Sequence, residues 1–439
     1  MAMQDGELET WQEIAAYLSV SVREAQYREK NDQMPVHRLP GRKSRVWAYR
    51  AELDEWKARN SSAPTNGSVG RKFPTRRALL GLAGTAAAAV GTAVLLRSRK
   101  LQVARASIEG NSLCAWDEVG RLAWKYTFPG VLNQVHDNRH ILKRPERQVQ
   151  IVDYRGDGHK QIVVATAFKQ PDGSWPASEE LQCFSSGGKF QWRYRPDLAL
   201  PFGDTRFSGP WTVTDMMVAP DAAGKNSVWV SLAHWNWRPG AVLTIGGNGA
   251  PVVRFVSAGN VYALGSVNNA SGHYVLAGGI NNEYNEAALA VLRVDGQPSC
   301  SPQTSGTRFE CIDGPKGLPD RYFLFPPSEL NVAYGRPYNE INFVGMSGGL
   351  LTVETDEVPN GVNAIYTFSK DIEPVDVAFG DDYAVWHRRF EDQRLLKHDL
   401  ADCPQLLRPT PVRRWDAKSG WRSVAVAPAV SVRPGAFHE

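Results

Sequence analysis

Hydrophobic and polar residues follow different patterns in different parts of the 439-residue chain. Near the N-terminus apolar residues recur at helical spacing, with Trp11, Ile14 and Leu18 on one face. A long uncharged run comes next, and beyond it short apolar stretches alternate with turn residues, which is typical of β-structure. The pattern predicts a multidomain chain with four parts: a small α+β domain (1–60), a flexible linker (61–74), an apolar segment (75–100) and a large all-β domain (101–439).

The first sixty residues predict a helix, a turn, a second helix, a β-hairpin and a last helix. Thr10 is placed to cap the first helix, since a Thr followed three residues later by Glu forms a capping box. Residues 36–39 and 45–49 predict two strands around a Pro-Gly turn. The last helix would turn Leu53 and Trp56 toward the interior.

Two stretches of this domain, TWQEIAAYLSVSVREAQ (10–26) and MPVHRLPGRKSRVWAYRAELDEW (34–56), resemble the excisionase/MerR-like winged helix-turn-helix family. The resemblance implies a second helix that enters the major groove and a wing that contacts the phosphate backbone. The positions that would contact DNA are Ser21, Arg23, Gln26, Arg28, Arg42, Lys43 and Arg45.

Three positions depart from that family. Glu24, Tyr27 and Arg28 stand where the family usually has Thr, a basic residue and Trp. The residues before Thr75 are also nearly balanced in charge, with twelve basic and ten acidic side chains, so their attraction to phosphate is modest. The alternative is that this fold serves as a protein-interaction or anchoring module.

The nineteen residues from Ala78 to Leu96 carry no charge. At about 1.5 Å per residue, a helix of this length reaches roughly the 30 Å of a hydrocarbon core, so we expect a transmembrane helix. Because the run is rich in small residues, a buried helix of a soluble protein is the alternative. Gly84 and Ala88 offer a small-residue face for helix pairing, which suggests a homodimer.

Two arginines stand just before this run. The residues TRRALL (75–80) resemble the twin-arginine export motif, which implies either an anchor that stays or a signal that is cut. Four basic residues flank each side of the run, so charge does not decide the orientation. The two domains supply it instead. We expect a single-pass inner-membrane protein with a cytoplasmic N-terminus and a periplasmic or otherwise extracytoplasmic large domain.

The large domain predicts short strands joined by turns, and no long helix. Turns are expected at 346–349 and 380–382. The clearest strands are 161–167, 227–232, 251–256, 274–277, 288–294, 341–344, 350–353, 365–368, 375–379, 383–387 and 423–427.

Two segments of this domain repeat a strand, a glycine turn and a strand closed by Trp. Residues 113–126 and 181–194 both end in the pattern G-[KR]-x-x-W-[KR]-Y, and residues 290–296 are a weaker copy. The pattern resembles the outer hairpin of quinoprotein-type β-propeller blades, which implies that each blade buries one face on the next. Blades of about 40–50 residues would give about seven. A pair of β-sandwiches or an irregular β domain is the alternative.

Residues 151–164 resemble the cation loop of integrin-type FG-GAP (VCBS) repeats, in which alternate carboxylates and a sharp Gly turn hold calcium. Asp153 and Asp157 occupy ligand positions, which makes calcium the one cofactor to consider. Arg155 replaces an oxygen ligand and Gln161 replaces a carboxylate. A tight hairpin without a metal is therefore the favoured interpretation.

The five cysteines include no C-x-x-C pair, which argues against a zinc or thioredoxin-type motif. Cys300 and Cys311 are close in sequence. They can form a disulfide in an oxidising compartment, or remain ordinary thiols in a cytosolic protein.

We expect no enzymatic activity. The sequence shows neither the vicinal cysteine pair nor a set of cofactor-binding residues of quinoprotein dehydrogenases, and its nine histidines are scattered. Residues 234–239, HWNWRP, form the one aromatic and polar cluster that could line a ligand pocket.

Composition adds little, because 42% hydrophobic and 22% charged residues are ordinary for a folded protein and a net charge of +4 does not imply nucleic acid. Domain order is more informative. We interpret the chain as a single-pass membrane protein that couples an extracytoplasmic propeller, which binds an unknown ligand or protein, to a cytoplasmic DNA-binding domain of a transcriptional regulator. The alternative is an exported or membrane-anchored propeller that acts as a binding scaffold without DNA binding.

Overall fold

The computed structural model describes residues 7–8, 10–18, 25, 29, 34–38, 46–50, 52–54, 56, 103–132, 144–169, 179–234, 239–359 and 361–429. The chain divides into two compact units, residues 1–97 and 98–439. The linker and the apolar segment 75–100 lie outside the described residues. Within the described residues, no helix is both long and apolar enough to cross a membrane.

The small unit contains a capped helix and a three-stranded sheet. Helix α1 (Trp11–Leu18) follows Thr10, whose Oγ1 accepts a hydrogen bond from the backbone N–H of Glu13 at 3.2 Å, as the capping box predicts. The strands pair in the order β1-β3-β2, with bounds Glu7–Leu8 (β1), Val46–Tyr49 (β3) and His37–Arg38 (β2).

The core of the small unit joins the helix, the sheet and the residues that follow it. Ile14 and Leu18 on α1 are buried together with Ala48 on β3. Leu53 and Trp56 are buried in the same cluster, as the sequence pattern predicts. The apolar side chains that recur at helical spacing therefore form one interior.

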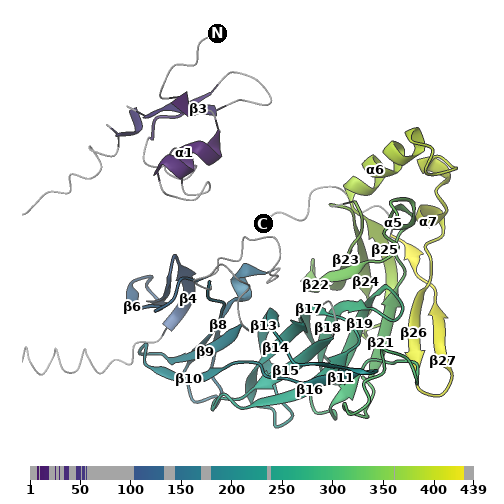
Figure 1. Ribbon diagram of the computed structural model, residues 1–439, viewed down its shortest axis with the longest axis horizontal. Helices are drawn as coiled ribbons and strands as arrows, with labels where there is room; N and C mark the ends of the chain where they lie inside the picture. Colours follow the sequence, from purple (N-terminus) through teal and green to yellow (C-terminus); the bar gives the residue numbers. More distant parts are fainter. Residues whose placement is uncertain are drawn as a thin grey trace, which may run out of the picture. The chain divides into compact units, whose positions relative to one another are not determined.

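Five antiparallel sheets, which we call blades 1 to 5, form the described part of the large unit (Figure 1). Blade 1 contains β4 (Val103–Glu109), β5 (Ser112–Asp117) and β6 (Leu122–Thr127). Blade 2 contains β7 (Val149–Val152), β8 (Gln161–Thr166), β9 (Glu180–Ser185) and β10 (Phe190–Tyr194). Blade 3 contains β13 (Trp211–Pro220), β14 (Asn226–His234), β15 (Gly240–Ile245) and β16 (Pro251–Ser257).

The last two blades are built in the same way. Blade 4 contains β17 (Val261–Asn269), β18 (Gly272–Asn281), β19 (Glu286–Arg293) and β21 (Arg321–Phe325). Blade 5 contains β22 (Glu340–Ser347), β23 (Leu350–Asp356), β24 (Asn363–Phe368) and β25 (Pro374–Phe379). Neighbouring strands of each blade come in chain order, which is the order of a propeller blade, and only β20 (Ser299–Cys300) interrupts it, between β19 and β21.

Short additional strands extend blades 3, 4 and 5. Strand β20 (Ser299–Cys300) pairs in parallel with β16, and β28 (Ala427–Pro428) pairs in parallel with β25. Strands β26 (Val412–Asp416) and β27 (Gly420–Val424) continue blade 4 beyond β21. The hairpin β11 (Leu200–Phe202) and β12 (Thr205–Phe207) lies between blades 2 and 3 in the sequence. The C-terminal strands therefore join blade 4 to blade 5.

Consecutive blades pack face to face. Their first strands contact one another in the series β4, β7, β13, β17 and β22. Four hydrophobic clusters occupy the four spaces between consecutive blades. Side chains alternate between them: Val275 on β18 faces blade 3, whereas Leu276 faces blade 5. The expectation that each blade buries a face on the next is confirmed.

Blades 1 and 5 lie at the two ends of an arc (Figure 1). All six residues of β15 in blade 3 are buried, while burial alternates along β24 in blade 5 because only one face meets another blade. The described residues include no packing of β4 against β22 comparable to that between consecutive blades. Five blades are described where seven were expected, because strands of up to ten residues and the added segments use more chain per blade.

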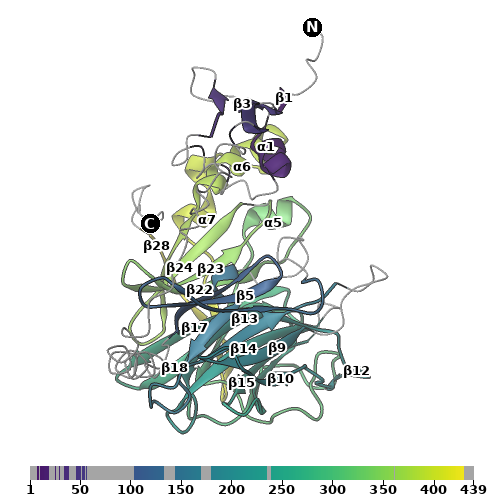
Figure 2. The same cartoon turned by 90° about the vertical axis from the view of Figure 1, so that its left-hand side faces the viewer.

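Short helices lie at the far end of blade 5 (Figure 2). They are α5 (Glu329–Ala333), α6 (Asp381–Asp392), η2 (Leu400–Asp402) and α7 (Pro404–Leu407). The predicted strand 383–387 and the predicted turn 380–382 are wrong, since both belong to α6 and to its N-cap, Gly380. Tyr383, His387 and Phe390 are buried at helical spacing, and two acidic residues occupy the first turn.

Candidate functional site: the inner edge of the blades

The first strands of the blades form the inner edge of the arc, and two arginines bind to that edge. Arg144 and Arg147 stand at the single turn η1 (Pro145–Arg147), directly before β7. Arg147 Nη1 lies 3.0 Å from Asp215 Oδ2 on β13 and donates to the Leu264 carbonyl on β17 at 2.8 Å. One side chain from the start of blade 2 therefore links the first strands of blades 3 and 4.

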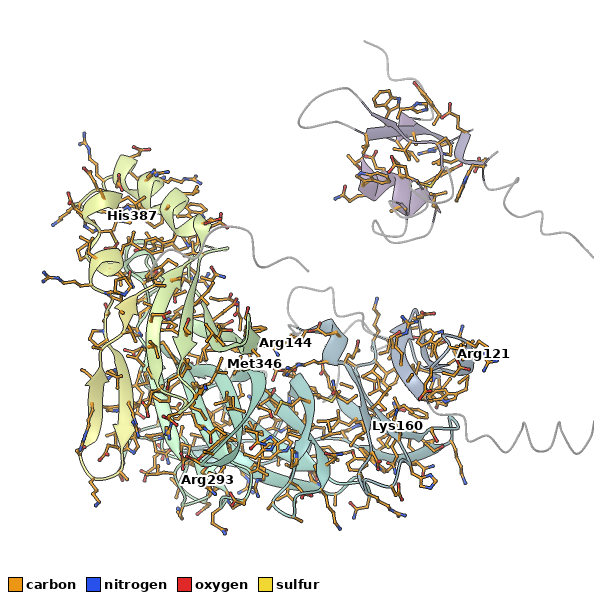
Figure 3. The ribbon with its side chains drawn as sticks, turned by 180° about the vertical axis from the view of Figure 1, so that it is seen from behind. Arg121, Arg144, Lys160, Arg293, Met346 and His387 are labelled. Atoms are coloured by element: carbon orange, nitrogen blue, oxygen red, sulfur yellow. The ribbon has the colours of Figure 1, made fainter. Side chains whose placement is uncertain are left out.

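Arg144 reaches the last blade. Its Nη2 donates to the Val344 carbonyl on β22 at 2.8 Å, and its guanidinium lies 4.2 Å from the ring centroid of Phe343. Burial lowers the pKa of Arg144, and the neighbouring charge of Arg147 adds to that effect. In the described part of the chain Nε of Arg144 is buried without a hydrogen-bond partner. Figure 3 shows Arg144 and Met346 close together on the inner side of the arc.

Asp215 is the buried partner at this edge, with 1% of its surface exposed. Its Oδ2 accepts the backbone N–H of Leu264 at 2.8 Å, and its Oδ1 accepts that of Met216 at 2.8 Å. Burial raises the pKa of the Asp215 carboxyl, while Arg147 and these amides oppose the rise. The charge is thus paired and hydrogen-bonded, as a buried carboxylate requires.

The charged side chains of the inner edge bind one another and the backbone of blades 3, 4 and 5. Met346, near the end of β22, is 58% exposed, so the first strand of blade 5 carries an accessible apolar side chain.

The predicted DNA-contacting residues lie outside the described residues, as do positions 235–238 of the predicted aromatic cluster. His234 from that cluster is buried, and its Nε2 lies 3.2 Å from the Gly209 carbonyl. Its ring packs against Trp211 and Phe207. The described part of the cluster therefore belongs to the interior of blade 3.

Asp153 and Asp157 lie in the turn between β7 and β8, and their carboxylates bind the loop's own backbone. Asp153 accepts N–H groups from Arg155 at 3.2 Å, Gly156 at 2.8 Å and Gly158 at 2.7 Å. Desolvation acts to raise the pKa of Asp153, but these backbone amides together lower it. The turn is a hairpin closed by its own backbone hydrogen bonds, and the alternative of calcium binding at Asp153 and Asp157 is a separate, less favoured prediction.

Cys300 and Cys311 are both buried and face each other as thiols beside Gly314. A Cβ on Gly314 would lie 2.3 Å from the Cys311 sulfur and 3.1 Å from the Cys300 sulfur, so only glycine leaves room for the pair. A hydrogen bond between the thiols raises the pKa of Cys300 and lowers that of Cys311. The disulfide between them stays a prediction for an oxidising compartment.

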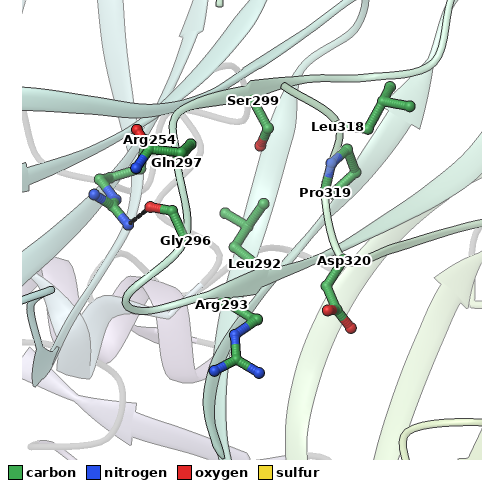
Figure 4. Close-up of a pocket in the computed structure, with 9 residues that line it drawn as sticks. All are labelled: Arg254, Leu292, Arg293, Gly296, Gln297, Ser299, Leu318, Pro319 and Asp320. Carbon is green, nitrogen blue, oxygen red and sulfur yellow. Dashed lines mark hydrogen bonds between the residues drawn. The ribbon is translucent and has the colours of Figure 1, made fainter. Parts of the chain in front are cut away.

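Two small cavities occur in the described part of the large unit. One of about 160 Å³ lies between blades 3 and 4, where Arg254 Nη2 donates to the Gly296 carbonyl at 2.8 Å (Figure 4). The other, of about 320 Å³, lies beside the start of β22 and the end of β23 and is lined by Arg336, Tyr338, Glu340 and Asp356, among others. The first is smaller than the roughly 300–1,000 Å³ of typical ligand pockets, and the second is at the lower limit.

Sequence reasoning missed the inner-edge residues. Arg144 and Arg147 stand in a loop without a motif, so no spacing identifies them. Asp215 does carry a signal, because it is the one charged residue in the otherwise uncharged strand Trp211–Pro220. A charged side chain in a strand that is buried on both faces requires a partner. The partner of Asp215 is Arg147, which lies on the inner edge of the blades.

No protein-family profile matches the chain, and no curated protein matches it. Solved structures similar to it include BamB from Moraxella catarrhalis, with 10% identity over 63% of each chain and a TM-score of 0.28. The Dos1 propeller has 9% identity over 61% of this chain and 52% of its own, with a TM-score of 0.32. A GH43 β-1,3-galactosidase has 11% identity over 60% of this chain and 84% of its own, with a TM-score of 0.29.

These likenesses are weak. The chain spans less than two thirds of the BamB chain and about half of the Dos1 propeller. TM-scores near 0.3 are below the level at which two chains share an overall fold, so the blade architecture rests on the strand order and the packing described above.

Proposed function

We propose that the chain is a membrane-anchored binding protein whose β domain takes a protein partner at the inner edge of its blades. One observation carries this proposal, namely that the described blades form an arc whose inner strand in blade 5, β22, carries the exposed side chain of Met346. The charged groups of the inner edge are already bound to one another and to the backbone. Such a surface offers contact area.

The N-terminal domain supplies the second half of the proposal. Its capped helix, its hairpin strands β2 and β3 and its buried Leu53 fit the winged-helix resemblance, and DNA contact through residues such as Arg23 and Arg45 follows from that resemblance alone. With the large domain placed outside the cytoplasm, partner binding would change how the DNA-binding domain is presented or paired.

The alternative function is an anchored or exported scaffold that does not read DNA. A salt-dependent mobility shift of duplex DNA separates the two. The proposal requires a shift that weakens when Arg23 and Arg45 are both replaced by Ala, whereas the scaffold gives no shift at any salt concentration.

Photocrosslinking in living cells tests the partner site. A photoreactive phenylalanine analogue replaces Met346 in the full-length chain, and the same analogue replaces Val119 as a matched control. Val119 is 75% exposed and lies in the β5–β6 turn of blade 1, away from the inner edge. We expect one crosslinked protein at position 346 and none at position 119. Equal yields at both positions, or no adduct at position 346, would remove the inner edge as the partner site.

A further inference from the structure

Four side chains with metal-binding atoms meet among the short helices at the end of blade 5. They are Glu329 on α5, His387 on α6, His398 in the following loop and Cys403 at the start of α7. One ligand atom from each lies within 4.8 Å of the corresponding atoms of the other three. Figure 3 labels His387 on α6. Four separate segments of the chain therefore bring donor atoms to one point.

The distances fit a four-coordinate metal. Glu329 Oε1 lies 2.9 Å from Cys403 Sγ and 3.2 Å from His387 Nε2. His398 Nε2 lies 3.2 Å from Glu329 Oε2 and 3.3 Å from His387 Nε2. Zinc binds nitrogen and oxygen at about 2.1 Å, so the edges of its coordination tetrahedron are about 3.4 Å. The His387–Glu329, His398–Glu329 and His387–His398 separations are close to that length, and every separation within the cluster is at most 4.8 Å.

The contacts within the cluster are crowded. Nδ1 of His387 lies 2.5 Å from Glu391 Oε1, so Nδ1 directs its proton to that carboxylate and Nε2 is turned toward the cluster. There Nε2 lies 3.2 Å from a carboxylate oxygen of Glu329 and 3.3 Å from Nε2 of His398. Glu329 Oε1 also has Tyr383 Oη at 3.0 Å and Cys403 Sγ at 2.9 Å. More groups converge on this oxygen than its lone pairs can accept.

We propose that Glu329, His387, His398 and Cys403 bind one divalent transition metal of the zinc type. A thiolate and a carboxylate together neutralise the two positive charges, and two neutral imidazoles complete the set. A thiolate with two imidazoles favours zinc and similar borderline metals over magnesium or calcium. Four protein ligands fill the tetrahedron, so the site is structural and leaves no position for a reacting water.

Neighbouring groups hold the ligands in place. Glu391 stands one helical turn after His387 and fixes its tautomer so that Nε2 points at the cluster. Gln405 Oε1 accepts the backbone N–H of Glu329 at 2.8 Å and the hydroxyl of Tyr383 at 3.2 Å. Such contacts orient metal ligands in proteins. Hydrogen bonds from neighbouring residues therefore hold His387 and Glu329 in position.

The location explains why a metal would be useful there. His387 and Cys403 are fully buried, while Glu329 and His398 keep about a quarter of their side-chain surface exposed. Helices α5 and α7 have five and four residues, too few to hold together by helix propensity alone. A metal that links α5, α6 and α7 adds to the hydrophobic cluster of Leu330, Tyr383 and Phe390 that already joins these helices.

The absence of a C-x-x-C pair argues against a short zinc motif, and the proposed ligands follow no such motif. They come from four segments, and residues 383–387, which the pattern predicts as a strand, lie in helix α6. His387 and His398 are eleven residues apart in sequence, which matches no short zinc motif.

Metal analysis of the full-length chain tests the proposal. The protein is purified without a polyhistidine tag from zinc-supplemented medium, and zinc is counted by mass spectrometry. We expect about one zinc ion per chain, falling below about one tenth in Cys403→Ser and in His398→Ala. His273→Ala is the matched control, because His273 is a partly exposed histidine on blade 4 that lies 3.0 Å from the Ser266 hydroxyl. It should retain the ion.

Cobalt provides a readout that does not depend on how well the variants fold. Cobalt added to the wild-type chain should give the absorption of a tetrahedral ion together with a sulfur-to-metal charge-transfer band. That band should disappear in Cys403→Ser. A wild-type chain that contains no zinc and gives no cobalt spectrum would overturn the proposal. The four side chains would then be joined only by hydrogen bonds and ion pairs.

Discussion

Glu179, directly before β9, is a carboxyl group whose surroundings favour the neutral form. Its Oε2 accepts the backbone N–H of Val213 at 2.8 Å. Desolvation raises its pKa from 4.5 to about 7, although the Val213 amide opposes the rise. The folded state thus holds this proton more tightly than the unfolded chain does. Its contribution to stability is full below about pH 4.5 and is lost as the pH rises through about 7.

Replacing Glu179 with Gln should therefore change the pH dependence of stability. Gln keeps an oxygen for the Val213 amide and has no charge to desolvate. We expect the melting temperature of Glu179→Gln to match wild type at pH 5 and to exceed it at pH 8 by about 2–4 °C, the shift that about 1 kcal/mol causes in a large domain. Thermal unfolding of both proteins at the two pH values measures this difference.

A matched control separates burial from the general effect of removing a negative charge. Glu118 is exposed in the β5–β6 turn of blade 1. Glu118→Gln should show no such dependence on pH. A Glu179→Gln variant that follows wild type across the whole range would show that this carboxyl is not desolvated.

The structural role of a residue was predictable where its partners are close in sequence. The N-cap at Thr10 follows from the sequence because its partner, Glu13, is three residues away. Asp215 carries a signal of its own, but its contact with Arg147 was not predictable, since that contact depends on how blades 2 and 3 meet. The same holds for Glu329, whose neighbours in the metal cluster come from later segments.

A hydrogen bond from a Trp in the last strand of one blade to a turn of the next blade occurs twice, at the two positions of the Trp pattern in the sequence. Trp124 in blade 1 donates from Nε1 to the Ser186 carbonyl of blade 2 at 2.8 Å. Trp192 in blade 2 donates to the Gly247 carbonyl of blade 3 at 3.0 Å. Each Trp therefore fastens its blade to the turn before the last strand of the next blade.

Arginine takes over this contact in the later blades. Arg254 in blade 3 donates to the Val294 carbonyl of blade 4 at 2.7 Å. Arg321 in blade 4 donates to the Ile372 carbonyl of blade 5 at 3.2 Å. This change of residue explains why the sequence shows only two clear copies of the Trp pattern, although the contact occurs four times.

Glycines beneath the tryptophans allow a sharp test of these contacts. Gly188 has φ +81°, and a Cβ there would lie 2.8 Å from the Trp124 ring. Gly120 occupies the corresponding turn of blade 1 with φ +79° and has open space around it. We expect Gly188→Ala to destabilise the protein by about 1–3 kcal/mol more than Gly120→Ala, because only the first overpacks a ring. Chemical denaturation of both variants measures the difference.

Gly188 and Gly120 have the same left-handed backbone conformation. The free-energy cost of placing Ala in that conformation is therefore the same in both variants and cancels in the difference between them. Gly249→Ala, which would bring a Cβ to 2.8 Å from the Trp192 ring, should behave like Gly188→Ala. Equal losses at all three glycines would mean that the tryptophans do not pack closely on the next blade.

Strands were predicted more reliably than helices in the large unit. Residues 341–344 and 350–353 were expected as strands and lie in β22 and β23, because apolar residues and a glycine turn specify a hairpin locally. Helix α6 was misread because its first turn follows a strand directly and its aromatic residues favour strands as well. Only the burial of Tyr383, His387 and Phe390 on one side distinguishes the helix.

The whole chain combines two units of different kinds. The structure separates residues 1–97 from residues 98–439 as compact units, while the predicted division into four parts with bounds at 60, 74 and 100 stays a prediction. Blade number was not predictable from repeat length, since the inserted strands and helices are not part of the repeat. The location of each unit in the cell rests on the apolar run and on the type of domain on each side of it, so it stays a proposal.

Protease accessibility of the two units decides that proposal. Distinct epitope tags are placed at the two ends of the full-length chain, and protease is added to cells whose inner membrane is intact. We expect the large unit to be degraded and the N-terminal tag to be protected, with both accessible once the membrane is broken. Protection of both ends, or loss of both, in intact cells would place the two units on the same side and refute a membrane-spanning regulator.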